Sequence, residues 1–167
     1  MLANQMNGEQ LPLLNGFPLR LIVPGWYSTY WVKMLSDIEI LDAPDDNYWM
    51  KTAYRIPATL HANVKPDESG FPTEPINKMA PRSFFTNLTN GAIVKPGAPL
   101  PVRGIAFGGD CGVAKVELSE DGGLTWREAT LGLEEGKYGF RRWDAEVGAP
   151  SSGTVTRSMT SGAMTPS

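Results

Sequence analysis

The sequence predicts a chain of two parts, of which the second is a small antiparallel β-sandwich of the immunoglobulin-like class. Its 167 residues include 18 glycines and 14 prolines, a composition that favours short strands and turns over helices. From Arg82 onward, short strand-like segments recur at regular spacing, as in an all-β domain. In one segment, Trp143, Ala145 and Val147 alternate with charged residues, which indicates a strand with one buried face.

The first residues of the chain are expected to form loops and one strand. Residues 1–18 are interpreted as loop or short helix that leads into a turn at Asn15-Gly16. Residues 19–23 are continuously apolar apart from Arg20, and such a run predicts a short buried strand.

Residues 31–81 carry weaker signals. Residues 31–41 are interpreted as a turn followed by a half-exposed strand, because Ile38 and Ile40 flank a glutamate. Residues 42–81 are rich in proline, aspartate and asparagine and show no sustained periodicity. They are interpreted as loops that cross between domains.

Six strands are predicted in the second part. They cover residues 83–88, 92–94, 100–107, 114–119, 125–131 and 140–147. Residues 120–123 are expected to be a hairpin turn, because Gly122 and Gly123 readily adopt positive φ. Residues 150–167 are rich in serine, threonine and glycine and are interpreted as a flexible tail.

The composition excludes several classes of protein. A net charge of −3 provides no basic field for nucleic acid, and no apolar run approaches the roughly 20 residues that span a bilayer. The first ten residues lack the basic start and apolar centre of a signal peptide. One cysteine excludes an intramolecular disulfide and a multi-cysteine metal site, and one histidine excludes a multi-histidine site.

Residues 15–33 place two cations around an aromatic-rich loop. Arg20 interrupts an apolar run, where a buried cation is costly unless an anion meets it. Lys33 follows a loop that opens at Pro24-Gly25, so the strand and loop together can hold both cations near one anionic group. The alternative is that both side chains are solvated, and their spacing alone favours that alternative.

Several ordered motifs give the chain a family resemblance. They are Gly16-Phe17-Pro18-Leu19-Arg20, Val23-Pro24-Gly25 and Val32-Lys33, together with stretches at residues 6–12, 46–57 and 107–126. With these motifs the chain resembles the sulfite oxidase family of molybdopterin oxidoreductases, in particular the bacterial sulfite dehydrogenases, over roughly residues 1–148. Several motifs that agree in order are far more specific than a single motif.

The resemblance implies a mixed fold with three regions. Residues 1–81 are expected to be the C-terminal part of an α+β molybdopterin-binding domain, and residues 82–149 an incomplete immunoglobulin-like dimerisation domain. Residues 150–167 are expected to be a flexible or aberrant tail. The family's molybdenum-ligating cysteine and substrate-site tyrosine would precede Met1, so a C-terminal fragment is expected. Such a fragment should be poorly stable, because an absent terminal strand exposes a sheet edge.

The resemblance also assigns cofactor-binding residues. In the family, the positions of Arg20 and Lys33, and the two positions before the lysine, here Trp31 and Val32, contact the pterin cofactor. Asn15 stands where the family often has a cofactor-contacting histidine, and asparagine can form hydrogen bonds but carries no charge. The implied cofactor is molybdenum-molybdopterin, with only part of its site in this chain. No catalytic residue and no metal ligand is expected among these residues.

The implied reaction is the two-electron oxidation of sulfite to sulfate, with electrons passing to a cytochrome-type acceptor. The intact protein is expected to be a homodimer or heterodimer without nucleic acid or a membrane span, and bacterial relatives are commonly periplasmic. The chain alone is expected to be inactive, because it lacks the metal thiolate ligand. The alternatives are a sulfane dehydrogenase, the molybdenum domain of a nitrate reductase, and a non-catalytic dimerisation module.

Other candidate residues have a structural explanation beside the functional one. Lys51 and Arg55 either present cations to an anionic substrate or are solvated, and at least one is expected to be solvated. Cys111 is interpreted as a small buried or loop thiol and not as the molybdenum ligand. His61 is interpreted as a loop residue. Six aromatic residues either line a cofactor cleft or pack in a core and an interface: Tyr27, Tyr30, Trp31, Tyr48, Trp49 and Tyr54.

Overall fold

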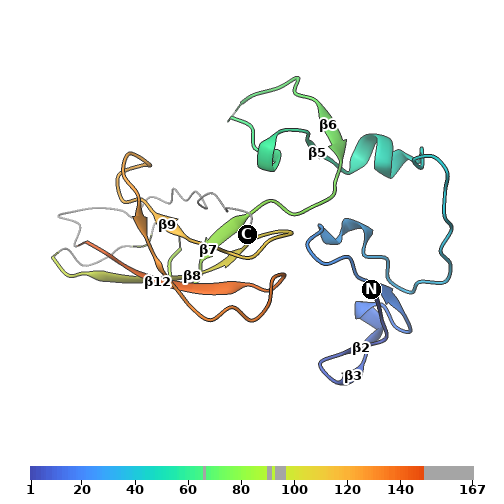
Figure 1. Cartoon of the computed structure of the whole chain (residues 1–167), viewed down its shortest axis with the longest axis horizontal. Helices are drawn as coiled ribbons and strands as arrows, with labels where there is room; N and C mark the ends of the chain where they lie inside the picture. Colours follow the sequence, from blue (N-terminus) through green and yellow to red (C-terminus); the bar gives the residue numbers. More distant parts are fainter. Residues whose placement is uncertain (66, 90–91, 93–96, 149–167) are drawn as a thin grey trace. The chain divides into compact units, whose positions relative to one another are not determined.

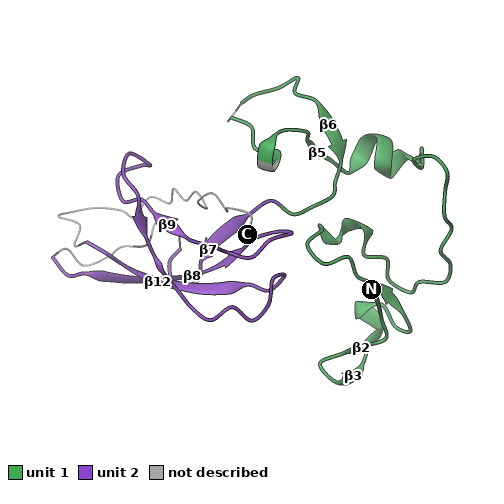
Figure 2. Cartoon of the chain, in the orientation of Figure 1, with its two compact units in different colours: residues 1–79 green, residues 80–167 purple. Residues whose placement is uncertain are grey.

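The computed structural model describes residues 1–65, 67–89, 92 and 97–148, which Figure 1 shows as a coloured ribbon. The chain divides into two compact units, residues 1–79 and residues 80–167 (Figure 2). Regular structure in the described residues is mostly β, and their helical segments are short 3₁₀ and π turns. Across these same residues, no helix has the length and apolar character needed to cross a membrane.

The first unit is built from short elements joined by turns. In chain order they are β1 (Leu2–Ala3), β2 (Gln5–Met6), β3 (Glu9–Gln10), η1 (Leu13–Asn15), β4 (Arg20–Leu21), η2 (Ser28–Tyr30), η3 (Trp49–Ala53), β5 (Arg55–Pro57), η4 (Leu60–Ala62) and β6 (Thr73–Pro75). Three antiparallel pairs connect the strands: β1 with β4, β2 with β3, and β5 with β6. η3 is a single π-helical segment, and the other three helical segments are 3₁₀ turns.

The strand predicted over residues 19–23 is present but shorter than expected. β4 covers only Arg20 and Leu21, and both residues are half-buried where full burial was expected. Its partner in the described residues is the two-residue strand β1. Backbone hydrogen bonding continues past β4, since the Ile22 amide donates to the Met1 carbonyl oxygen at 2.9 Å, but the regular ladder covers only two residues.

Two further expectations for the first unit are wrong. No strand forms over residues 36–41, where Ile38 and Ile40 are 62% and 94% exposed. Alternating sequence makes a strand only where another strand and a packing surface are available, and no described strand pairs with this segment. Residues 42–81, which were expected to be loops, contain the elements η3, β5, η4 and β6.

The second unit contains a four-stranded antiparallel sheet in the spatial order β11–β12–β8–β7 (Figure 1). Its strands are β7 (Arg82–Phe85), β8 (Leu100–Phe107), β11 (Thr130–Leu131) and β12 (Arg141–Val147). A separate two-stranded ladder joins β9 (Glu117–Leu118) to β10 (Arg127–Glu128). The pairing of β8 with β12 extends from Arg141 opposite Ala106 to Val147 opposite Leu100.

The core of the second unit surrounds a buried tryptophan. The core residues are Val102, Ala106, Val113, Val116, Leu118, Ala129 and Trp143. Trp143 is only 1% exposed, and its ring packs edge-on against Phe85 with 5.4 Å between the ring centroids. Gly104 lies opposite Trp143 in the sheet, and a Cβ atom at Gly104 would collide with the indole ring. Glycine at position 104 therefore leaves room for the indole ring.

Two predicted strands of the second unit are confirmed with close to their predicted bounds. β8 covers residues 100–107 as predicted, and β12 covers all but the first residue of the predicted segment 140–147. The predicted alternation in β12 is confirmed as well, since Arg142, Asp144 and Glu146 are exposed on the opposite face from Trp143.

Other predicted strands differ in length. Segments 83–88 and 114–119 form the shorter strands β7 and β9, and segment 125–131 is divided into β10 and β11 at Ala129. Ala92 is not in a strand, whereas residues 93 and 94 and the tail 150–167 lie outside the described residues. The α+β character of the first part and the immunoglobulin-like class of the second are not confirmed and stay predictions.

The hairpin turn between β9 and β10 is present as predicted, and Gly122 and Gly123 have φ angles of 75° and 94°. Asp121 accepts hydrogen bonds from the Thr125 hydroxyl at 2.6 Å, from the Thr125 amide at 2.9 Å and from the Ser119 hydroxyl at 2.8 Å. These bonds, led by the Thr125 hydroxyl, lower the pKa of Asp121 from 3.8 to about 2.

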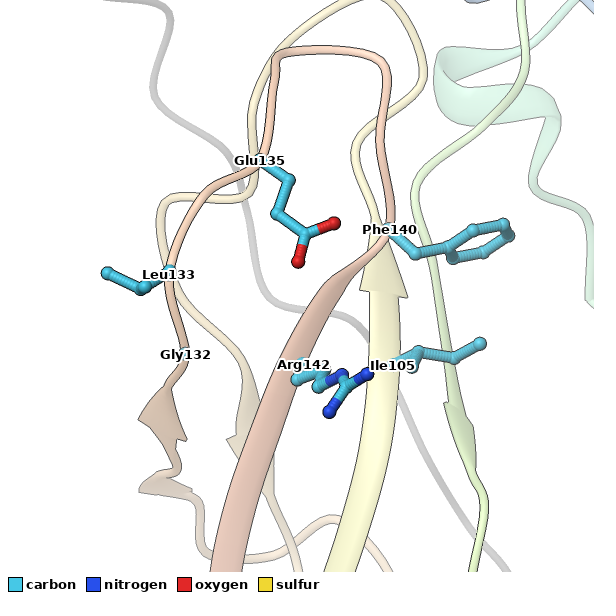
Figure 3. A pocket seen from close by; sticks show the side chains of 6 residues that line it. All are labelled: Ile105, Gly132, Leu133, Glu135, Phe140 and Arg142. Atoms are coloured by element: carbon cyan, nitrogen blue, oxygen red, sulfur yellow. The ribbon is translucent and has the colours of Figure 1, made fainter. Parts of the chain in front are cut away.

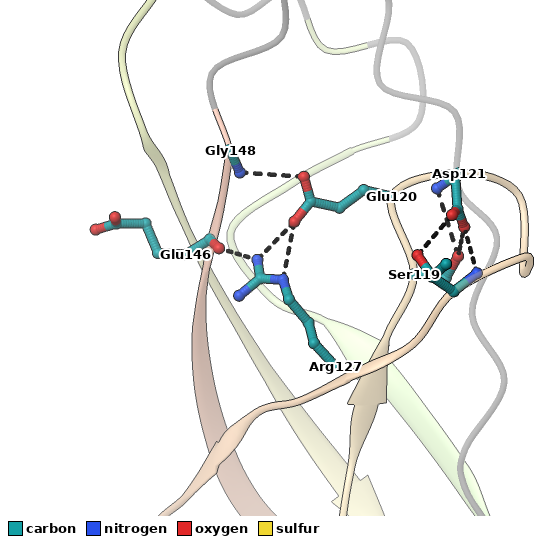
Figure 4. A network of polar contacts seen from close by, with 7 residues as sticks. Ser119, Glu120, Asp121, Arg127, Glu146 and Gly148 are labelled. Carbon is teal, nitrogen blue, oxygen red and sulfur yellow. Dashed lines mark hydrogen bonds and ion pairs between the residues drawn. The ribbon is translucent and has the colours of Figure 1, made fainter.

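A polar network joins this hairpin to the end of β12 (Figure 4). The Arg127 guanidinium forms an ion pair with Glu120, with 2.7 Å between Nη2 and Oε1, and also donates to the carbonyl oxygen of Glu146. Glu120 accepts a hydrogen bond from the Gly148 amide at 3.1 Å through its other oxygen. The two-stranded ladder is thereby fixed against the four-stranded sheet.

Candidate cofactor-binding site

Backbone hydrogen bonds place residues 31–35 beside strand β4 in the first unit. The Leu21 amide donates to the Val32 carbonyl at 2.9 Å, and the Leu35 amide donates to the Leu19 carbonyl at 2.8 Å. These two bonds close the loop that separates Arg20 from Lys33 in the sequence. Arg20 and Lys33 therefore lie on two backbone segments that are adjacent in the folded chain.

Arg20 lies half-buried between two of the other predicted site residues. Its Nη1 atom donates to the carbonyl oxygen of Asn15 at 3.2 Å, and its guanidinium carbon lies 5.8 Å from the centroid of the Trp31 ring. A cation over an indole face is attracted by the ring quadrupole. Asn15 thus contacts Arg20 through its backbone, which the sequence did not reveal.

Lys33 is also hydrogen-bonded to the turn η1. Its Nζ atom donates to the carbonyl oxygen of Leu14 at 2.6 Å, while the side chain remains exposed. Gly16 packs directly against it, since a Cβ atom at Gly16 would lie 3.0 Å from the Lys33 Cβ atom. Gly16 also has a φ of 109°, which favours glycine. The predicted Gly-aromatic-Pro motif therefore shapes the backbone that carries Lys33.

Three donor atoms in this segment are buried and lack a hydrogen-bond partner among the described residues. They are Arg20 Nε, Tyr30 Oη and Trp31 Nε1. Buried polar atoms are nearly always hydrogen-bonded, so each such atom carries a desolvation cost. All three can donate, and the partners that would satisfy them are acceptor atoms such as phosphate or carbonyl oxygens. The residues present therefore fit a ligand that is anionic and rich in acceptors.

The charge of the segment agrees with such a ligand. In the described part of the chain, neither Arg20 nor Lys33 forms an ion pair with a carboxylate. Val32 is 48% exposed and contributes its carbonyl group to the loop. Of the five predicted site residues, Asn15 lies in η1, Arg20 in β4, and the other three in the segment beside β4. Direct contacts join Arg20 to Asn15 and to Trp31, whereas Lys33 is joined to the turn through Leu14.

The Tyr30 hydroxyl is the donor that the sequence did not single out. The sequence placed Tyr30 among aromatic residues that wall a cleft or fill a core, and its ring does pack edge-on against Tyr54 with 6.4 Å between centroids. Its position directly before Trp31 is the signal that could have identified it, because a buried tyrosine normally finds a partner for its hydroxyl.

Lys51 and Arg55 have local roles in the structure. Lys51 forms an exposed ion pair with Asp46 at 2.9 Å. Arg55 donates to the side chain and the carbonyl oxygen of Thr73 and to the carbonyl of Met50. Arg55 therefore joins β5 to β6, and its three guanidinium nitrogen atoms all form hydrogen bonds within the chain.

No cluster that could hold a metal ion occurs in the residues that the structure describes, counting groups of three or more His, Cys, Asp or Glu side chains. Cys111 is half-buried in the second unit, where its Sγ atom lies 3.4 Å from the carbonyl oxygen of Gly108. His61 lies in η4, within the first unit.

Two domain families match the chain. Residues 1–49 match the oxidoreductase molybdopterin binding domain, which includes the whole loop described above. Residues 73–156 match the Mo-co oxidoreductase dimerisation domain, which includes the four-stranded sheet.

Individual proteins match most of the chain. Mitochondrial sulfite oxidase from Mus musculus is 33% identical over 157 residues, which are 90% of this chain and 28% of that protein. Nitrate reductase [NADH] from Cucurbita maxima is 33% identical over 88% of this chain and 18% of its own length. The crystal structure of the sulfane dehydrogenase SoxCD from Paracoccus pantotrophus gives a TM-score of 0.72 with 26% identity, over 89% of this chain and 36% of that chain. The chain thus spans about a third or less of the length of each protein.

Proposed function

The chain belongs to the sulfite oxidase family of molybdopterin oxidoreductases, and we propose that it forms part of an enzyme that oxidises sulfite to sulfate. The first unit would contribute part of the pterin-binding site, and the second would hold two subunits together. The observation that carries the proposal is the group of three buried donors at Arg20, Tyr30 and Trp31. These donors lie within the segment that matches the molybdopterin-binding domain.

The residues that would hold the cofactor are Arg20, Trp31, Val32, Lys33 and Asn15. Arg20 offers a planar fork of donors suited to a phosphate group, and Lys33 offers a compact positive charge. Asn15 and Leu14 orient these two cations through their carbonyl oxygens. Trp31 covers one side of the Arg20 guanidinium, which limits its access to water.

The bound molybdenum cofactor would supply the two-electron oxidation of sulfite. The side chains of this loop would bind and orient the cofactor's anionic group, and their positive charge would favour its retention. Electrons would leave to a cytochrome-type acceptor, as the resemblance implies.

A sulfane dehydrogenase is the second candidate, and the structural similarity to SoxCD favours it. The molybdenum domain of a nitrate reductase is a third candidate, favoured by the identity with the Cucurbita maxima enzyme. A non-catalytic dimerisation module is the remaining alternative, because the four-stranded sheet and its core belong entirely to the second unit.

The binding role can be tested by measuring the pterin content of the chain after co-expression with the cofactor-synthesis enzymes. We expect pterin to co-purify with the chain, and Arg20→Ala to lower its content about tenfold or more. A hydrogen bond to a charged group contributes about 1.5–3 kcal/mol, which corresponds to that factor. Lys51→Ala is the matched control, since Lys51 pairs with Asp46 and should leave the pterin content unchanged. Absence of pterin from the unaltered chain would contradict the binding role.

The reaction can be tested on the pterin-loaded enzyme of which the chain forms part, because the chain alone is expected to be inactive. Sulfite, sulfane sulfur and nitrate would be supplied in separate assays, with ferricytochrome c as oxidant for the first two and a reduced dye as donor for nitrate. Sulfite-dependent cytochrome reduction supports the proposal, whereas turnover of only one of the other substrates supports the corresponding alternative. Retained pterin without any turnover supports a non-catalytic module.

A further inference from the structure

On the side opposite Trp143, the four-stranded sheet has an outer face on which Arg103, Arg142 and Asp144 are exposed. Its cross-strand rows follow from the register: Arg142, Ile105 and Phe84 lie opposite one another, and Asp144 lies opposite Arg103. Phe84, on the edge strand β7, is 38% exposed on this face. A sheet in a monomer usually presents polar residues on its solvated face, so an exposed phenylalanine there indicates a contact surface.

A hollow of about 590 Å³ lies at one end of this face (Figure 3). It is lined by Ile105, Gly132, Leu133, Glu135, Phe140 and Arg142. Leu133 and Phe140 are 90% and 54% exposed, which is high for large apolar side chains at one site. A second hollow of about 520 Å³ shares Ile105 and Arg142 with the first. The two hollows therefore flank one row of the sheet.

The charged groups at the first hollow have no partner among the described residues. Figure 3 shows the side chains of Glu135 and Arg142 directed toward the hollow. Within the described ranges, neither side chain forms a hydrogen bond or an ion pair, whereas the neighbouring Arg103 and Asp144 pair with each other at 3.2 Å. One unpaired cation and one unpaired anion at the same hollow make the surface complementary to a copy of itself.

We propose that this face, centred on Ile105 and Arg142, is the contact surface for a second copy of the chain. The inference rests on the proposed self-association of the second unit and specifies where it occurs. In a two-fold arrangement the same patch meets itself, so Arg142 of each copy would face Glu135 of the other. Burial of Arg142 without an anion would be costly, and the partner's Glu135 removes that cost. The exposed Leu133, Phe140 and Phe84 supply the apolar area of the contact.

The test is sedimentation of the full chain and of charge-reversal variants over a range of concentrations. We expect the unaltered chain to dimerise, and Arg142→Glu or Glu135→Arg alone to raise the dimer Kd about tenfold or more, because like charges then meet across the contact. The double variant R142E/E135R restores opposite charges and should recover most of the affinity. Glu128→Arg, an equal charge reversal on β10 of the other ladder, is the control and should leave the Kd unchanged.

Each outcome decides a separate point. A dimer that both single variants leave intact would place the contact elsewhere and overturn this inference, while the proposed association would stand. A chain that is monomeric at all concentrations would overturn the proposed association itself. Glu135 lies in an exposed loop, so Glu135→Arg should keep its fold even if Arg142→Glu does not. Circular dichroism shows whether each variant is folded, and only the Kd of a folded variant tests the contact.

Discussion

The two units differ in how their residues are held. Among the described apolar residues that are buried, all but Leu11 belong to the second unit, which has its own core around Trp143. The first unit consists of short ladders and turns, and it exposes large residues such as Leu14, Ile40 and Leu60. The comparison shows that hydrophobic burial maintains the second unit, whereas backbone hydrogen bonds between short ladders and turns set the geometry of the first.

Removal of the core tryptophan is the strongest way to test this difference. Trp143→Ala should destabilise the second unit by about 3–5 kcal/mol, because it removes a buried aromatic side chain and leaves a cavity. Denaturant unfolding followed by circular dichroism measures the loss. Trp49→Ala is the control in the first unit, where Trp49 is 53% exposed and packs against the rings of Tyr48 and Tyr54, and it should cost much less. An equal cost for both variants would contradict the proposed contrast.

The first unit should respond to backbone changes at its turn. Gly16→Ala should destabilise the turn by about 1–2 kcal/mol, because alanine tolerates positive φ poorly. It should also displace Lys33, which a Cβ atom would approach to 3.0 Å. Hydrogen exchange of the Met34 amide, which donates to Gly16, reports the local opening.

Gly8→Ala provides the matched control for that change. Gly8 also has a positive φ, of 82°, but a Cβ atom there would meet nothing within 4 Å. Both variants should therefore lose backbone stability, while only Gly16→Ala should lower the pterin content. If Gly8→Ala lowered the pterin content equally, the contact between Gly16 and Lys33 would have no specific role.

A smaller effect is expected from pH at the hairpin of the second unit. Hydrogen bonds lower the pKa of Asp121 to about 2 in the folded chain, below its ordinary 3.8. The stabilisation is therefore complete above pH 3.8 and is lost as the pH falls toward about 2. Hydrogen exchange of the Thr125 amide should accelerate in this window beyond the intrinsic pH effect.

Asp121→Asn should abolish this dependence, because asparagine does not ionise. Asp45 in the first unit is the comparison, since hydrogen bonds from the amide and side chain of Asn47 also lower its pKa. An unchanged pH dependence in Asp121→Asn would show that another group controls the hairpin.

The sequence predicted the second unit better than the first. The alternation around Trp143 and the strand predicted at residues 100–107 correspond to the two long central strands β12 and β8. The same kind of alternation at Ile38 and Ile40 gave no strand. Periodicity indicates what a segment can form, but a strand also needs a partner, and partners come from distant parts of the chain.

The sequence by itself determined the glycine-rich turns and the segment that carries Arg20 and Lys33, because these depend on neighbouring residues. It also indicated which segments of the second unit could form the long strands. Only the tertiary structure decided that Arg20 lies over Trp31 and that its Nε atom is buried without an acceptor. It alone decided, too, that Arg142 and Glu135 share a hollow without pairing. The physical reason is that burial and charge pairing depend on which distant segments meet, and the local pattern of residues does not encode this contact.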